Sequence, residues 1–145
     1  MFRTRPGRQI GNIILLSVLL LFFNSCARKM QFLQSTIVPG AEGRARVKKD
    51  NNGNHAIQVK IKHLIQPDNL IPAQRTYVVW MESNQSTVKN LGQLKSSKGL
   101  FSKSFKGTLT TVSPFEPRRI FITAEADGAI VYPYGPPVLT TGTHY

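Results

Sequence analysis

The side chains able to do chemistry are few in this sequence and lie far apart. The histidines His55, His63 and His144 lack the close spacing of metal ligands. Glu125 and Asp127 are near neighbours at the expected end of a strand, where they could cap a turn or contact an ion. The sequence contains no G-x-S-x-G nucleophile motif and no phosphate-binding glycine loop. We therefore predict a protein that is not an enzyme and that uses no metal and no cofactor.

Cys26 is the only cysteine, and it comes directly after an apolar segment. Residues 1–9 are basic, residues 10–23 are almost entirely apolar, and the small residue Ser25 precedes Cys26. A basic start, a short apolar stretch and a small residue at the cleavage point are typical of a secretory signal peptide. The alternative is an uncleaved membrane helix, which needs about 20 apolar residues. The sequence thus predicts export, with cleavage between Ser25 and Cys26.

The segment Phe23-Asn24-Ser25-Cys26 resembles the lipobox of bacterial lipoproteins, whose signal peptidase cuts before a cysteine that is then diacylated. Ser25 fits that pattern, whereas Phe23 and Asn24 depart from its strictest form. The resemblance implies lipidation of Cys26 and anchoring to a bacterial membrane, since two acyl chains hold a protein stably where one does not. The alternative is a secreted protein with an incidental thiol. No acidic surface-export signal follows Cys26, so we expect the periplasmic face of the outer membrane.

The part of the chain after the signal peptide is strongly basic. Removing residues 1–25, with their three arginines, leaves 16 Lys and Arg against seven Asp and Glu, a net charge of +9. This balance favours anionic partners such as phospholipid headgroups, lipopolysaccharide or acidic glycans. Nucleic acid is not expected as a partner, because export removes the chain from the cytoplasm. The alternative is a basic surface that is only solvated.

Residues 43–65 predict a β-hairpin. Apolar and polar residues alternate in both halves of the segment, which is the period of half-buried strands. The loop Asn51-Asn52-Gly53 places glycine third, as a three-residue hairpin loop prefers. This loop pairs residues whose numbers sum to 104, so that Val47 faces Ile57 on the inner side.

The outward side of this hairpin is predicted to be a basic face. In the same register Arg44 faces Lys60, although like charges directly opposite each other destabilise a sheet slightly. Such a face could bind an anion or lie against the membrane. The alternative is a salt-screened outer surface, or a sheet edge kept from aggregating by its charges. The candidate contact residues are Arg44, Arg46, Lys48, Lys60 and Lys62.

The rest of the chain predicts further short strands separated by turns. Residues 77–81 are apolar on both faces, as in a central strand, and Trp80 is expected in the core. Gly92 marks a bulge or a close approach, and His63 occupies an alternating position where it is expected to be partly buried. We predict an all-β fold, an antiparallel and immunoglobulin-like β-sandwich of about seven or eight short strands.

Four segments occur in order: Tyr77-Val78-Val79-Trp80, Asn90-Leu91-Gly92, Phe121-Ile122-Thr123-Ala124-Glu125 and Gly135-Pro136-Pro137-Val138-Leu139. Together they resemble the extracytoplasmic C-terminal β-domain of membrane-bound bacterial anti-sigma factors, over residues 74–142. The resemblance implies the same kind of β-domain. In that family a cytoplasmic sigma-binding segment comes first, and the 25 residues before Cys26 are too few for one. Sigma-factor inhibition is therefore not expected.

These features predict a signal peptide over residues 1–25, a lipidated flexible tether over 26–42, a β-sandwich domain over 43–142 and a tail over 143–145. On this interpretation the protein is a membrane-anchored bacterial lipoprotein. Its non-enzymatic domain binds anionic lipid, a glycan or an envelope protein. The alternative, suggested by the anti-sigma resemblance, is a structural or stress-sensing accessory of the cell envelope.

Overall fold

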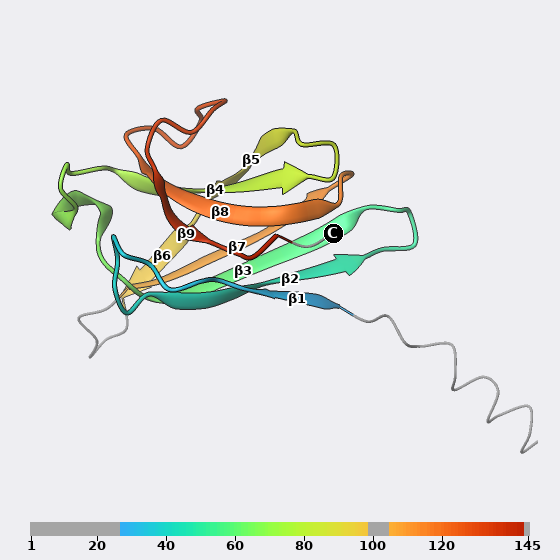
Figure 1. Cartoon of the computed structure of the whole chain (residues 1–145), viewed down its shortest axis with the longest axis horizontal. Coiled ribbons are helices and arrows are strands. Elements are labelled where there is room, and N and C mark those ends of the chain that lie inside the picture. The colour runs from blue at the N-terminus through green and yellow to red at the C-terminus, as the bar shows by residue number, and fades with distance from the viewer. Residues whose placement is uncertain (1–26, 99–104, 144–145) are drawn as a thin grey trace, which may run out of the picture.

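The computed structural model describes residues 27–98 and 105–143, and within them the chain is almost entirely built of strands and turns (Figure 1). One short 3-10 helix, η2 (Pro67–Asn69), interrupts this pattern. The strands are β1 (Arg28–Gln31), β2 (Glu42–Lys49), β3 (His55–Leu64), β4 (Thr76–Ser83), β5 (Val88–Gln93), β6 (Lys95–Lys98), β7 (Phe105–Ser113), β8 (Pro117–Glu125) and β9 (Pro137–Thr140).

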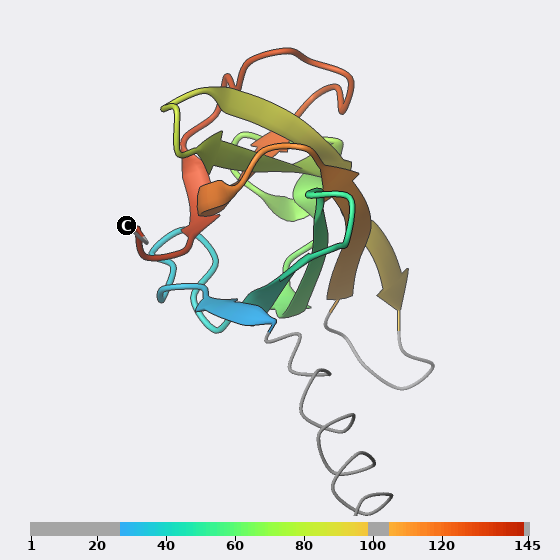
Figure 2. The ribbon, with the colours of Figure 1, turned by 90° about the vertical axis from the view of Figure 1, so that its right-hand side faces the viewer.

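The strands form two antiparallel sheets that pack face to face, which confirms the all-β sandwich. The five-stranded sheet has the order β1-β2-β3-β7-β6, and the four-stranded sheet has the order β5-β4-β8-β9. Two links join the sheets at their edges. Leu94 alone separates β5 from β6, and Phe32 forms an isolated bridge with Thr141. Seen from the end of the molecule, the two sheets therefore wrap around a common interior (Figure 2).

Because the strands run along its long axis, the molecule has two ends with different content (Figure 1). The start of β1 and the β2–β3 turn lie at one end, which we call the hairpin end. The opposite end, which we call the loop end, carries the three longer connections, residues 33–41, 65–75 and 126–136. At about 3.3 Å per residue, the nine residues of β8 span about 26 Å between the two ends.

The β2–β3 hairpin has the predicted register, with Val47 paired to Ile57 and Arg44 paired to Lys60. Its turn is closed by the Asp50 carboxylate, whose Oδ1 accepts hydrogen bonds from the backbone N–H groups of Asn52 and Asn54, both at 2.8 Å. Gly53 adopts a φ of 83°, the left-handed conformation that glycine tolerates best. Local turn chemistry and strand alternation therefore agree on a single pairing.

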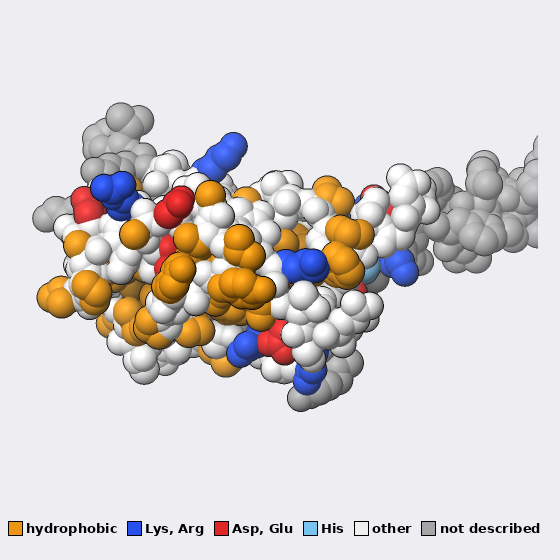
Figure 3. Space-filling model, turned by 90° about the horizontal axis from the view of Figure 1, so that it is seen from above, with side chains coloured by type: hydrophobic (Ala, Val, Ile, Leu, Met, Phe, Trp, Pro, Cys, Tyr) orange, Lys and Arg blue, Asp and Glu red, His pale blue; other side chains and the backbone are white. Residues whose placement is uncertain are grey.

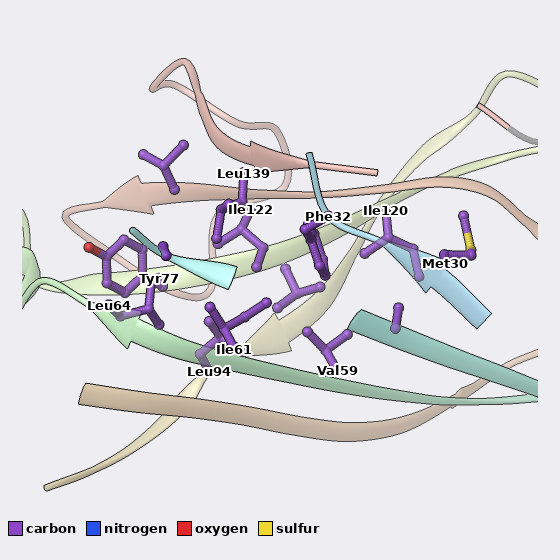
Figure 4. Close-up of a cluster of buried hydrophobic side chains, with 14 of the residues drawn as sticks. Met30, Phe32, Val59, Ile61, Leu64, Tyr77, Leu94, Ile120, Ile122 and Leu139 are labelled. Atoms are coloured by element: carbon purple, nitrogen blue, oxygen red, sulfur yellow. The ribbon is translucent and has the colours of Figure 1, made fainter. Parts of the chain in front are cut away.

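The main core fills the space between the two sheets. Its largest members point inward from both sheets, as the close-up shows (Figure 4). Each fully buried aliphatic side chain of this kind stabilises the fold by about 1.5–3 kcal/mol. The side chains labelled there are Met30, Phe32, Val59, Ile61, Leu64, Tyr77, Leu94, Ile120, Ile122 and Leu139.

Trp80 is fully buried, but it lies in a second cluster rather than between the sheets. β4 is apolar on both faces and is central in its sheet, as predicted. Its inward residues join the main core, whereas Trp80 points outward and stacks on Phe121 with ring centroids 6.4 Å apart. Ile130, from the loop between β8 and β9, packs against this cluster. That loop therefore rests on an apolar base on the outer side of the four-stranded sheet.

The structure corrects the prediction of a flexible tether over residues 26–42. From Arg28 onward, this segment is part of the sandwich. β1 pairs with β2, and both Met30 and Phe32 are buried in the main core. The Arg28 guanidinium contacts Glu116 Oε1 at 3.3 Å and donates a hydrogen bond to the Pro117 carbonyl, which ties β1 to the start of β8. The physical reason is the alternation of buried Met30 and Phe32 with exposed neighbours. In the sequence, Pro39-Gly40 indicates an irregular segment, but in the structure this pair marks only the turn before β2.

Two irregularities in strand pairing change the direction in which nearby side chains point. Gly92 has a φ of 123° at a register shift between β4 and β5, which confirms the predicted bulge. His63 has a φ of 57° at a second shift, between β3 and β7. The left-handed backbone turns the imidazole outward, so His63 is exposed, and the prediction that it would be partly buried is wrong. Its Nε2 lies 3.8 Å from Glu42 Oε1.

Candidate anion-binding face

The five basic residues singled out in the sequence lie together on the outer surface of the five-stranded sheet. Ala45 and Val47 of β2 point into the core, so the residues between them point outward. β3 follows the same rule, with Ile57, Val59 and Ile61 inside. The exposed side chains that result are Arg44, Arg46, Lys48, Lys60 and Lys62.

Neighbouring strands extend this surface beyond the hairpin. Lys29 of β1 pairs with Arg46, and Lys95 of β6 pairs with Thr108 of β7, which itself pairs with Lys60. Lys106 has the same orientation as Thr108, because the two are separated by one residue of the same strand. We call the whole surface the cationic face. Its members are Lys29, Arg44, Arg46, Lys48, Lys60, Lys62, Lys95 and Lys106.

The charges on the cationic face are close enough to reinforce one another. Same-face residues are about 4.7–4.9 Å apart across strands and roughly 6.6 Å apart along a strand. Both spacings are shorter than the Debye length of about 8 Å at physiological salt. Among the described residues, Glu42 alone adds a carboxylate to this face, opposite Lys62. A shallow hollow of about 40 Å³ lies between Arg44, Arg46, Gln58 and Lys60. The face can thus hold several anionic groups at once.

Sequence reasoning missed the three outer members of the face. The sequence does contain a signal for Lys29, because it alternates with buried Met30 in the segment that the sequence predicts to be a tether. Lys95 and Lys106 reach the face only through the β3–β7 and β6–β7 pairings. Those pairings join residues far apart in the chain, and a local pattern carries no information about them.

Ser25 and Cys26 lie outside the residues that the structure describes, so cleavage and lipidation stay predictions. The described chain begins with Ala27, and β1 follows at once with Arg28. Over the described ranges, no helix is long and apolar enough to cross a membrane.

The other candidate groups cap turns or stand apart from one another. Glu125 Oε1 accepts hydrogen bonds from the backbone N–H groups of Tyr134 and Gly135, at 3.1 and 3.2 Å. Asp127 Oδ1 accepts one from Ala129 N–H at 2.9 Å. Both acids therefore cap the loop between β8 and β9, one of the two roles predicted for them. Within residues 27–98 and 105–143, no group of three or more His, Cys, Asp or Glu side chains is placed to hold a metal ion.

Comparisons of the chain with protein-family models, with curated proteins and with solved structures find no match. The placement and chemistry of these side chains are therefore the basis for assigning a function.

Proposed function

We propose that this protein is a lipid-anchored, non-enzymatic protein of the bacterial cell envelope that binds anionic headgroups through its cationic face. The observation that supports this most strongly is the array of exposed Lys and Arg side chains across all five strands of one sheet's described outer surface. A basic residue close to an anionic membrane surface contributes about 1 kcal/mol. Several such residues on one rigid face act together, because the fold has already fixed their spacing.

The position of the anchor supports the same function. Only Ala27 separates Cys26 from β1, so acyl chains on Cys26 would hold the sandwich directly at the lipid surface. Lys29 of β1 belongs to the cationic face, and the face therefore begins beside the anchor point. Stable membrane attachment generally takes two signals, such as an acyl chain and a polybasic patch. Here both signals would act on the same edge of the sheet.

The anchor is tested by the mass of the protein purified from bacterial membranes. We expect the wild-type chain to begin at Cys26 and to carry acyl chains, and we expect Cys26→Ala to be unprocessed or to leave the membrane fraction. An unmodified wild-type chain that begins at another residue would contradict the anchor. That result would leave the binding test below unaffected, since it uses no lipidated protein.

The cationic face is tested by sedimenting residues 27–145 with phospholipid vesicles, since these residues contain every described strand and the whole described core. We expect binding to phosphatidylglycerol vesicles, little binding to phosphatidylcholine vesicles, and a steep loss with added salt. The double variant Arg44→Gln/Lys60→Gln should bind several-fold more weakly. The control variant Arg75→Gln/Lys89→Gln removes the same amount of charge at two positions outside the face. It should bind the vesicles as tightly as wild type does.

Two further outcomes decide the partner. Equal weakening by the two double variants would show that only net charge matters, and would overturn a role for the face. Binding is also measured with vesicles that contain lipopolysaccharide in place of phosphatidylglycerol. This measurement compares the two sources of anionic headgroups in the envelope. The source bound more tightly at physiological salt is the better candidate for the natural surface.

A further inference from the structure

A large apolar groove opens at the loop end of the sandwich, and no residue of the cationic face lines it. It encloses about 730 Å³, within the range of about 300–1,000 Å³ that is typical of ligand sites. Its walls come from the three loop-end connections and from the ends of β8 and β9. Representative lining residues are Ile37, Ile71, Ile130, Tyr134 and Val138. Seen from the side of the four-stranded sheet, apolar side chains gather around the left and centre of the molecule (Figure 3).

The rim of the groove exposes apolar side chains that burial in the fold does not explain. Ile71 is fully exposed, and Tyr134 is 88% exposed. Val131 and Tyr132, on the same loop as Tyr134, are also largely exposed. Contiguous exposed apolar surface of this kind usually marks an interaction site. Its spread over neighbouring loops indicates a partner that covers the rim as well as the groove, which a small molecule seated in the groove would not do.

The loop between β8 and β9, which carries Tyr134, is held in place by hydrogen bonds to neighbouring strands. The Asn90 side-chain amide donates to the carbonyls of Gly128 and Ile130, at 3.0 and 2.8 Å. The Glu125 carboxylate holds the far end of the loop through its bonds to Tyr134 and Gly135. A loop fixed in this way loses little conformational freedom when a partner binds. The exposed side chains are thus pre-arranged for contact.

The charge of the groove is opposite to that of the cationic face. Glu125 and Asp127 line it, whereas no Lys or Arg of the described residues does so. A negative, apolar site disfavours anionic lipids and fatty acids, because their headgroups would meet these carboxylates. The same charge favours a partner that carries Lys or Arg beside its apolar side chains.

The position of the groove separates it from any membrane bound by the other face. It lies about 26 Å along β8 from the hairpin end, where β1 begins. None of the residues that line the groove belongs to the five-stranded sheet, whose outer surface is the cationic face. A membrane held at Cys26 or at the cationic face would therefore leave the groove open to the aqueous space.

We propose that this groove binds a segment of a partner polypeptide that inserts apolar side chains and carries a Lys or Arg beside them. Apolar anchors seated in a preformed pocket supply most of the binding energy of such contacts. The basic residue of the partner pairs with the carboxylate side of the groove and sets the orientation. This proposal does not require Cys26 to be lipidated.

The test selects random phage-displayed peptides on immobilised residues 27–145 at physiological salt, with counter-selection on Ile71→Ser/Tyr134→Ser. Both substituted side chains are exposed, so the fold should be retained. We expect enriched peptides that combine aliphatic or aromatic residues with Lys or Arg. The double variant should bind them about tenfold more weakly or worse, as expected when interface anchors are removed. Asp127→Asn keeps the oxygen that caps Ala129. It should weaken peptide binding several-fold and reduce the salt dependence of that binding.

Val112→Ser is the matched control, because Val112 is an exposed apolar residue on the outer side of β7, far from the groove. It should bind the selected peptides as wild type does. Failure to enrich any peptide that distinguishes wild type from the double variant would overturn the proposal. Enrichment only of acidic peptides that bind wild type and the double variant equally would do the same, because the cationic face and not the groove would then bind them. Uptake of the neutral dye N-phenyl-1-naphthylamine by the groove, without binding of any peptide, would also overturn the proposal. The ligand of the groove would then be a small apolar molecule.

Discussion

Arg44 and Lys60 lie directly opposite each other on β2 and β3, with both side chains exposed on the outer side of the sheet. The two like charges border the same shallow hollow. A directly opposed pair of like charges costs stability, and no acidic residue of the described chain lies between them on this face. The pair lies at the centre of the cationic face, where a bound anion would offset the repulsion between the two charges.

Arg44→Glu should therefore raise the stability of the fold while it weakens anion binding. The substitution converts a repulsive cross-strand pair into an attractive one, worth about 0.2–1 kcal/mol. Urea denaturation at low salt measures the gain, which should shrink at high salt. Arg75→Glu makes the same charge change outside the face and should leave stability within about 0.5 kcal/mol of wild type. A destabilised Arg44→Glu would show that the pair does not repel.

Met30→Ala should destabilise the fold by about 2–5 kcal/mol, the usual cost of truncating a buried Met. Met30 is fully buried against the main core, although it lies in the segment predicted to be a tether. Leu33→Ala is the control, since Leu33 is 54% exposed. Urea denaturation of both variants distinguishes the two interpretations. Equal and small effects would mean that the segment is a tether after all.

Thr123→Val should cost about 1–3 kcal/mol, because it leaves the buried indole N–H of Trp80 without its acceptor. Trp80 Nε1 donates to Thr123 Oγ1 at 2.8 Å, and both residues are fully buried. Trp80 is the only tryptophan in the chain, so its fluorescence reports the change directly. Thr110→Val on the exposed side of β7 should cost much less. A similar cost for the two variants would argue against this hydrogen bond.

Tyr77 should make the fold sensitive to alkaline pH. Burial raises the pKa of Tyr77 to about 12, and its hydroxyl donates to the Ile65 carbonyl at 2.9 Å. In the unfolded chain the pKa is about 10. The folded state therefore holds the proton more tightly, and this contribution to stability is complete below pH 10. It is lost between about pH 10 and pH 12, by at most about 1.4 kcal/mol per pH unit.

The measurement compares the urea stability of wild type and Tyr77→Phe from pH 9 to pH 11. Neutralisation of lysines affects both proteins alike, so the difference between them isolates Tyr77. We expect Tyr77→Phe to be the less stable protein at pH 9, because it lacks the hydrogen bond, and the gap to narrow as the pH rises. A constant gap would show that Tyr77 ionises equally readily in both states.

Much of this fold could be predicted where the information is local. The β2–β3 register follows from the turn Asn51-Asn52-Gly53 together with the alternation on both sides, and the two signals agree. The central position of β4 follows from an apolar run that leaves neither face suited to water. The basic face of the hairpin follows from the same alternation. These features depend on neighbours in the chain, whose geometry is set by backbone stereochemistry.

By itself, then, the sequence determined the class of fold, the hairpin and the inner members of the cationic face. Only the tertiary structure decided the rest. Pairing through β7 brings Lys95 and Lys106 to that face, and burial of Met30 and Phe32 draws the presumed tether into the sheet. The groove is likewise built by loops from three parts of the chain. Such contacts depend on the sum of many small burial energies over distant residues, which no short stretch of sequence encodes.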